Sequence, residues 1–416
     1  MNRVLVRSIL LAIAAGLLVA GAIWLRSRPQ GLPLADFPAV DSKGYIAALK
    51  ETGSTYRLVS IDPKGAVSEL AGGEEADDRE IVWKRDGRRV LFVSNRAPNG
   101  SYQIFEWLPD RDNDATQLTP SGAGRQNPWF TLGGRAFMYS SQGDILSTTY
   151  PKLVTSRVMP PSEEQSTEGE SGDHVHQPGE THNPITVAWN IVSKALEGEA
   201  FTAGYLDRSG KYFAGSYATN RGQAFVIQDM EPADEKDALA MAPVAGETID
   251  IAMHPTAPQA VVAVINFRYP ILSAIRKEKL KPDGSVTRDF VHAVFIAGLK
   301  EAKLTPIFFS QDGNQFMESP AISPDGTKVA LVAKQKSGEK TTTIGLLIAP
   351  IERGGVGKAD IVASGNVSEP SWSPDGEYLA FIKDGDIYTV QQSGGGEKNI
   401  TQGKGKFRTP LFSPMN

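Results

Sequence analysis

The four-residue turn Ser-Pro-Asp-Gly occurs twice, at Ser323–Gly326 and at Ser373–Gly376, with a spacing of 50 residues. Proline presets the backbone for a turn, and glycine takes the positive φ that a Cβ would disfavour. Around the second copy, strands are predicted up to Trp372, over Tyr378–Ile382 and over Ile387–Val390. This pattern predicts a four-stranded antiparallel unit, which cannot bury both of its faces without neighbours of the same kind.

Weaker copies of the turn recur along the chain, at Asp86-Gly87, Gly133-Gly134, Ser209-Gly210 and Pro255–Pro258. A β-rich run follows each of them, at Val90–Ser94, Ala136–Ser140, Tyr212–Ser216 and Ala260–Ile265. A repeat of about 40 to 50 residues, with short strands and Asp-Gly turns, is typical of an all-β fold of the β-propeller type. The six internal turns together with Gly44 predict seven blades, and six or eight stay open as alternatives.

The two ends of the chain carry the halves of one further unit. Thr409–Pro414 reads as a first strand with half of its turn, and Asp41–Leu49 reads as the other half with the next strand. We therefore expect the propeller to span residues 41–416, with strands from both ends sharing one blade. Closing the ring in this way would protect sheet edges that an open array exposes.

The first 40 residues are expected to place the protein at a membrane. Ile9–Leu25 carries no charge and is flanked by arginines, and as a helix it would be about 26 Å long, close to the hydrocarbon thickness of a bilayer. Residues 1–28 are therefore predicted to be a single-pass transmembrane anchor, or else a signal segment cleaved near Ala20–Ala22. Residues 29–40 are expected to be a linker. The propeller would then lie on the extracytoplasmic, periplasmic side of the inner or cytoplasmic membrane, or be secreted to the periplasm if the segment is cleaved.

The rest of the composition narrows the classes of function. The chain has 416 residues, a net charge of −5 and no cysteine. The acidic balance argues against a nucleic-acid partner, and the lack of cysteine excludes disulfides and thiol catalysis. Two stretches interrupt the repeat. Residues 159–183 are acidic and predicted to be disordered, and residues 268–288 are basic and lie between the second and third strands of their unit.

Several of these features resemble the TolB-type family of β-propellers. The Ser-Pro-Asp-Gly turns resemble its Asp-Gly repeats, and Phe92–Arg96 and Ser216–Gly222 resemble its hairpin between second and third strands. The resemblance implies a propeller and a habit of protein binding. The family's α/β domain has no counterpart in residues 29–40. Related propellers precede a serine-peptidase domain, but no Gly-x-Ser-x-Gly motif is present.

Two groups of side chains are weak candidates for metal ligands. Asp110, Asp112 and Asp114 have the spacing that begins a calcium loop, although Ala115 and Ser121 occupy its glycine and glutamate positions. His174, His176 and His182 lie in the acidic stretch and could bind Zn²⁺ or Ni²⁺. A solvated loop explains both groups better, so no metal and no cofactor is expected. Two further sets are interpreted as structural: Asp207, Asp325 and Asp375 as turn formers, and Trp83, Trp129 and Trp372 as packing between blades.

The function expected from these features is a non-catalytic, membrane-tethered scaffold that binds a protein or peptide. Its partner-binding residues are expected on the face that carries the hairpins between second and third strands, namely Arg96, Arg221, Arg276, Lys277 and Lys279. One alternative is a hydrolase or lyase that acts on an envelope polymer at the mouth of the propeller channel. Another is an extracellular sensory domain. No residue constellation demands catalysis.

The membrane anchor is directly testable. A reporter fused after Asn416 should be active outside the cytoplasm, and the protein should stay with the membrane after a carbonate wash, because Ile9–Leu25 would span the bilayer. Reporter activity confined to the cytoplasm would contradict the orientation. Complete release by carbonate would contradict the anchor.

Overall fold

The protein is known from a computed structural model that describes part of the chain. The described residues are 44–73, 75–84, 87, 89–109, 115–131, 136–141, 144–149, 154–157, 200–207, 212–219, 222–229, 245–246, 248–267, 291–298, 303–310, 314–352, 355–356 and 359–414. They all belong to the second of two compact units, Met1–Asp41 and Ser42–Asn416. The predictions for Ile9–Leu25, for residues 159–183 and for residues 268–288 lie outside them. None of the described residues forms a helix with the length and hydrophobicity that a membrane crossing requires.

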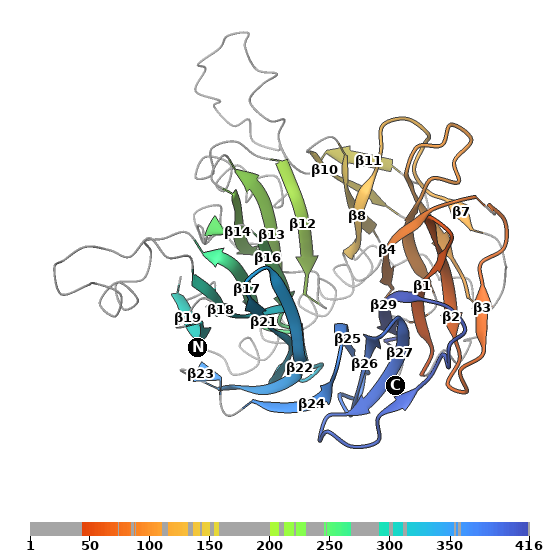
Figure 1. The fold of residues 1–416 in the computed structure, drawn as a ribbon. Helices are drawn as coiled ribbons and strands as arrows, with labels where there is room; N and C mark the ends of the chain where they lie inside the picture. The colour runs from red at the N-terminus through yellow and green to blue at the C-terminus, as the bar shows by residue number, and fades with distance from the viewer. Residues whose placement is uncertain are drawn as a thin grey trace, which may run out of the picture. The chain divides into compact units, whose positions relative to one another are not determined.

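The described strands form seven antiparallel sheets (Figure 1). Sheet 1 contains β29 (Phe407–Phe412), β1 (Ile46–Thr52), β2 (Thr55–Ile61) and β3 (Val67–Glu69); sheet 2 contains β4 (Asp78–Trp83), β5 (Val90–Ser94), β6 (Gln103–Trp107) and β7 (Thr116–Gln117); sheet 3 contains β8 (Gln126–Thr131), β9 (Ala136–Ser141), β10 (Asp144–Thr149) and β11 (Val154–Arg157). Sheet 4 contains β12 (Ala200–Leu206), β13 (Tyr212–Thr219), β14 (Gly222–Asp229) and β15 (Ala245–Gly246); sheet 5 contains β16 (Thr248–Met253), β17 (Gln259–Phe267), β18 (Val291–Gly298) and β19 (Lys303–Phe309). Sheet 6 contains β20 (Gln315–Ile322), β21 (Lys328–Ser337), β22 (Lys340–Glu352), β23 (Gly355–Val356) and β24 (Asp360–Ser364); sheet 7 contains β25 (Val367–Trp372), β26 (Tyr378–Lys383), β27 (Asp386–Gln391) and β28 (Lys398–Asn399).

The first strands of the sheets follow one another in a closed circuit. Each contacts the first strand of the next sheet, in the order β29, β4, β8, β12, β16, β20, β25, and β25 contacts β29 again. The predicted strands around Ser373–Gly376 and after the weaker turns are confirmed. An all-β fold of four-stranded antiparallel sheets around a closed circuit is the arrangement predicted for a propeller.

Strands from the two ends of the chain share sheet 1, as predicted. β29 pairs antiparallel with β1, with Ile46 opposite Phe412, and Figure 1 shows the dark blue β29 beside the orange β1. The Ser413 amide donates to the Tyr45 carbonyl over 2.8 Å. In sheet 7 the Ser373 amide makes the same bond to the Tyr378 carbonyl over 2.9 Å, so the split turn keeps the hydrogen bond of an intact one.

The Ser-Pro-Asp-Gly turns are stabilised by their own side chains. The Asp375 carboxylate accepts a hydrogen bond from the Ser373 hydroxyl and another from the Glu377 amide, and Asp325 holds the equivalent turn of sheet 6 in the same way. The interpretation of these aspartates as turn formers is confirmed. Gly326 has φ +76°, and a Cβ there would lie 2.0 Å from His254 Nε2 in sheet 5. A side chain at this position would therefore separate neighbouring sheets.

The first strands carry a β-bulge at equivalent positions. The pairing register breaks between Arg79 and Val82 in β4, and at the corresponding places in β8, β20 and β25. A non-glycine residue with positive φ lies in each bulge and in β29, and these residues are Glu80 (50°), Asn127 (50°), Ser319 (52°), Glu369 (53°) and Thr409 (51°). Because such a backbone costs about 1–3 kcal/mol in a non-glycine residue, surrounding contacts must stabilise it.

Hydrogen bonds between first strands supply these contacts. The carboxylate of Glu369 accepts the amide N–H of Thr409 in the next sheet, and Glu80 accepts that of Asn127 in the same way. Asp250, at the equivalent position of β16, accepts the amide of Ser319 over 2.9 Å. We call this bond the carboxylate clasp. Each clasp joins one sheet to the bulge of a neighbouring first strand.

Two tryptophans form hydrogen bonds in the opposite direction, each to the first strand of the preceding sheet. The Trp83 indole donates to the Leu411 carbonyl of sheet 1 over 3.0 Å, and the Trp372 indole donates to the Ala321 carbonyl of sheet 6 over 2.9 Å. The Trp129 ring lies 6.0 Å from the Phe213 ring of sheet 4. All three tryptophans are buried. The prediction that they pack between neighbouring units is confirmed.

Deleting Phe407–Asn416 should destabilise the protein far more than the loss of ten residues suggests. The deletion removes β29, the clasp to Glu369 and the hydrogen-bond acceptor of Trp83, and exposes the edge of β1. We expect loss of cooperative thermal unfolding and of solubility, measured by calorimetry and centrifugation. A deletion of Met415 and Asn416 alone, which follow β29, is the control. An unchanged melting temperature in the longer deletion would contradict the shared sheet.

Candidate binding site

The described hairpins between second and third strands, in sheets 1, 2, 6 and 7, define one face, which we call the upper face. A cavity of about 500 Å³ opens there between sheets 6, 7 and 1. Its walls come from the first strands near their bulges and from the adjoining hairpins and connections, and the lining residues are Glu51, Tyr56, Glu318, Ser319, Lys334, Ser368, Glu369, Ile382, Gly385, Lys406, Phe407 and Arg408. A concave site with polar groups from several elements is typical of ligand binding.

Only some of the six charged side chains of the cavity form ion pairs or hydrogen bonds with other residues. Glu318 pairs with Lys334, and one oxygen of Glu369 forms the clasp to Thr409. In the part of the chain that the structure describes, the side chains of Lys406 and Arg408 have no ionic partner. The Arg408 guanidinium instead lies over the ring of Tyr56, 5.1 Å from its centroid. Both cations are exposed and available to a ligand.

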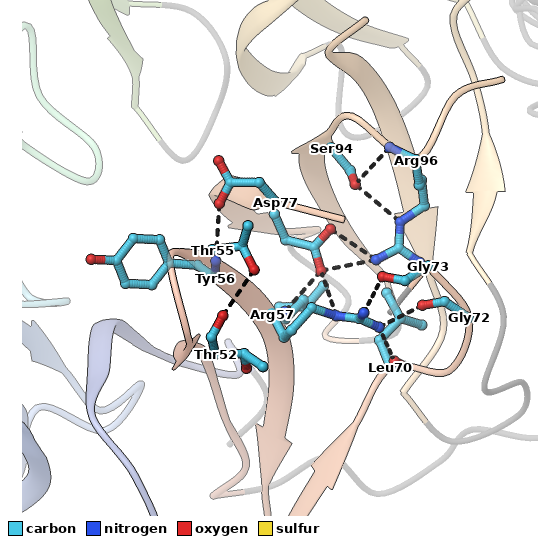
Figure 2. A network of polar contacts seen from close by, with 12 residues as sticks. Thr52, Thr55, Tyr56, Arg57, Leu70, Gly72, Gly73, Asp77, Ser94 and Arg96 are labelled. Atoms are coloured by element: carbon cyan, nitrogen blue, oxygen red, sulfur yellow. Dashed lines mark hydrogen bonds and ion pairs between the residues drawn. The ribbon is translucent and has the colours of Figure 1, made fainter. Parts of the chain in front are cut away.

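Tyr56 is held in the cavity wall by Asp77 of the neighbouring loop (Figure 2). The Tyr56 amide donates to Asp77 Oδ1 over 2.9 Å. Asp77 Oδ2 accepts from the Tyr102 hydroxyl (2.8 Å) and from Arg79 Nε (2.7 Å), and the Asp77 amide donates to Asn95 Oδ1. Residues of sheet 2 thereby fix a wall residue of sheet 1.

The same hydrogen bonds set the charge of Asp77. Burial alone would raise the pKa of its carboxyl, but the bonds from the Tyr56 amide, the Tyr102 hydroxyl and Arg79, with the charge of Arg79, together hold that pKa below its usual value. The carboxylate is therefore ionised at neutral pH and keeps all three donors.

A buried ion-pair network continues from this wall (Figure 2). Asp78 is fully buried, and both of its carboxylate oxygens accept from Arg96 Nη2, at 2.8 and 2.9 Å. Its Oδ2 also accepts the Leu58 amide over 2.9 Å and lies 3.8 Å from Arg57 Nε. Arg57 donates to the carbonyls of Leu70, Gly72 and Gly73. A buried charge with this many partners fixes the loop between sheets 1 and 2.

The predicted site residues are only partly described. The Arg96 side chain is 9% exposed and is committed to the bond with Asp78. Arg221, Arg276, Lys277 and Lys279 lie outside the described residues, so their role in binding stays a prediction. The same holds for the metal candidates Asp110, Asp112, Asp114, His174, His176 and His182. Among the residues that the structure describes, no group of three His, Cys, Asp or Glu side chains could hold a metal ion.

Sequence reasoning did not find the cavity residues. One signal was available, because Glu80 and Glu369 each lie three residues before a tryptophan that ends a first strand. That spacing could have identified the two glutamates that form clasps. Lys406 and Arg408 carry no such mark, since they converge with Tyr56 and Glu318 only through the closure of the ring.

Comparison with known proteins places the chain among β-propellers. The model of the dipeptidyl peptidase IV (DPP IV) N-terminal region matches residues 323–409, which include β21 to β28 and part of β29. The uncharacterized peptidase YuxL of Bacillus subtilis (strain 168) is 35% identical over 101 residues. This alignment covers 23% of the chain and 15% of YuxL.

The chain is also similar to solved structures of low sequence identity. An oligogalacturonate lyase in complex with manganese is 11% identical, with a TM-score of 0.51 and coverage of 86% of this chain and 85% of that one. TolB from Acinetobacter baumannii is 13% identical, with a TM-score of 0.43 and coverage of 89% and 83%. The likeness to the lyase shows the fold, and the fold does not fix the function.

The pH dependence of stability tests the role of Asp77. Because its folded-state pKa is lowered, its contribution is present above the unfolded pKa of about 3.9 and is lost as the pH falls through the folded value. Asp77→Asn should therefore cost about 1–2 kcal/mol at pH 7, and this cost should shrink below about pH 4. Urea unfolding of the wild type and of Asp77→Asn, from neutral to acidic pH, measures this difference in the free energy of unfolding.

Glu69→Gln is the matched control, because Glu69 forms an exposed pair with Lys50, and it should cost below about 1 kcal/mol. A cost of Asp77→Asn that stays constant from neutral to acidic pH would contradict the role of the ionised carboxylate.

Proposed function

We propose that the protein is a membrane-tethered, extracytoplasmic β-propeller of seven blades that binds a protein or peptide through the cavity of its upper face. The observation that carries this proposal is the cavity itself, which is walled by three sheets and lined by two exposed cations, Lys406 and Arg408, that have no ionic partner among the described residues. Binding sites concentrate on loops that a rigid scaffold positions. The seven sheets in closed order support the number of blades.

The described strands β17 and β11, which precede the two unusual stretches of the sequence, both run toward the upper end of their sheets. β17 ends at Phe267 and β18 begins at Val291, so the basic residues 268–288 connect a second strand to a third. β11 ends at Arg157 as the fourth strand of sheet 3, so the acidic residues 159–183 follow a fourth strand. In antiparallel sheets both kinds of connection emerge at one end. Two oppositely charged segments in one chain favour a protein partner.

A second candidate is an enzyme. The fold likeness to an oligogalacturonate lyase and the match to a peptidase N-terminal region favour a hydrolase or lyase, and Glu318 and Glu369 in the cavity are the carboxylates that such chemistry would use. The alignment spans only 15% of the length of YuxL. A peptidase activity is therefore only a proposal for this chain. A sensory domain would use the same cavity for a small molecule.

Crosslinking in membranes followed by recovery of the full chain tests the binding function. Deleting residues 162–182, or separately changing Arg276, Lys277 and Lys279 to glutamate, should leave the melting temperature unchanged and reduce partner recovery. Lys64→Glu is the control, because Lys64 is exposed in the turn after β2, at the opposite end of that strand from the upper-face hairpin. Wild-type recovery by both upper-face variants would contradict the proposal. Turnover of oligogalacturonate or of a peptide, lost in Glu369→Gln, would favour the enzyme.

A further inference from the structure

We infer that the upper-face cavity recognises a carboxylate on an extended peptide segment, through Arg408 and Lys406. This inference rests on the proposed function and adds the chemistry of the ligand. The two cations lie two residues apart at the start of β29, where the chain enters the shared sheet 1. The buried Phe407 between them anchors the strand, so both positions are fixed by the core.

Two of the three cations that line the cavity form no ion pair among the described residues and can bind a carboxylate. Glu318 and Lys334 neutralise each other, and Glu369 is engaged in the clasp. Glu51 remains, opposite two cations that have no ionic partner among the described residues. The Glu51 amide donates to the Lys406 carbonyl over 2.7 Å, which keeps the two residues adjacent. The six charged side chains of the cavity sum to zero net charge, so the attraction for an anion is local to Lys406 and Arg408, the two cations without an ionic partner among the described residues.

Arg408 is positioned before a ligand arrives. Its guanidinium lies over the Tyr56 ring, and the Tyr56 backbone is held by Asp77. A guanidinium that stacks on an aromatic ring keeps its N–H groups free at the edge, where they can bind a carboxylate in a bidentate manner. Less side-chain entropy is then lost on binding.

The remaining groups favour a peptide over a more highly charged ligand. A phosphate dianion would face the carboxylates of Glu51, Glu318 and Glu369, which repel it. A peptide carries a single carboxylate at a given position, and its amide N–H groups can donate to the free oxygen of Glu369 and to Ser368. The C-terminal carboxylate and the side chains of Asp and Glu present the same chemistry, so the probes must separate them.

Fluorescence anisotropy of the full chain with four labelled peptides of Gly, Ala and Ser tests the inference. The first has a free C-terminus; the second is amidated; the third is amidated and contains two Glu; the fourth is amidated and contains two Lys. We expect the first or the third to bind, the second and fourth to bind at least tenfold more weakly, and salt to weaken binding. The difference between the first and third identifies the source of the carboxylate.

Substitutions of the cavity residues test whether the peptide binds in the cavity. Arg408→Glu and Lys406→Glu should each weaken binding of the acidic probe by about tenfold or more, and Tyr56→Ala should weaken it less. Lys398→Glu, in a separate cavity of about 440 Å³ between sheets 7 and 1, is the matched control and should bind normally. Melting temperatures verify folding, and Arg408→Gln serves if the glutamate variant is unstable.

Three results would overturn the inference. They are equal binding of the amidated neutral probe, no binding of any probe at about millimolar concentration, and wild-type binding by both cavity variants. Displacement of the acidic peptide by oligogalacturonate with higher affinity would reassign the cavity to an acidic sugar. If the crosslinked partner is still recovered by Arg408→Glu, the proposed function stands and this inference fails.

Discussion

The carboxylate clasp is the interaction on which the ring depends. Each of the clasps from Glu80, Asp250 and Glu369 joins the first strand of one sheet to the equivalent residue of a neighbouring first strand. An ionised carboxylate makes a stronger hydrogen bond than a neutral acceptor, although burial raises the pKa of Glu80. The clasp also satisfies an amide that the bulge removes from the pairing of its own sheet. The cost of a positive φ in Asn127, Ser319 or Thr409 is thereby offset where the sheets meet.

The clasps also explain where the cavity lies. In β25 and β29 the bulge interrupts the strand pairing just after Ser368 and Arg408, which lie opposite Ile382 and Leu49 in their own sheets. Ser368 and Arg408 precede the bulge residues Glu369 and Thr409, and both line the cavity. The clasp from Glu369 crosses between the two strands at the same place. The geometry of the candidate site is therefore a consequence of ring closure and not of a separate loop.

The ion-pair network has a different role. It lies between sheets 1 and 2, where Asp78 bonds to Arg96 in its own sheet and to the Leu58 amide in the neighbouring one. Removing one partner would leave a buried charge, which costs more than the pair contributes. The network therefore makes the loop before β4 rigid, and Asp77 in that loop transmits this rigidity to Tyr56 in the cavity.

Much of the fold could be predicted from the sequence, because each turn carries a local signal. The turn at Ser373–Gly376, and the turn divided between Ser413 and Gly44, are each specified by proline, glycine and serine within a few residues. Such local patterns can be recognised in the sequence alone. The cavity was not predicted, because Tyr56, Lys334 and Arg408 come from three sheets and meet only when the ring closes. Arg96 was expected to bind a partner from its place in a hairpin, and its buried pairing with Asp78 depends on a residue in a different strand.

Amide hydrogen exchange at Thr409 tests the clasp most directly. Glu369→Ala should speed exchange of this amide by about tenfold or more, because the loss of a charge-assisted hydrogen bond costs about 1.5–3 kcal/mol. Glu369→Gln keeps an acceptor and should have a smaller effect, while amides in the centre of β26 should not change in either variant. Exchange at Thr409 that is the same in Glu369→Ala as in the wild type would contradict the claim that carboxylates hold the ring closed.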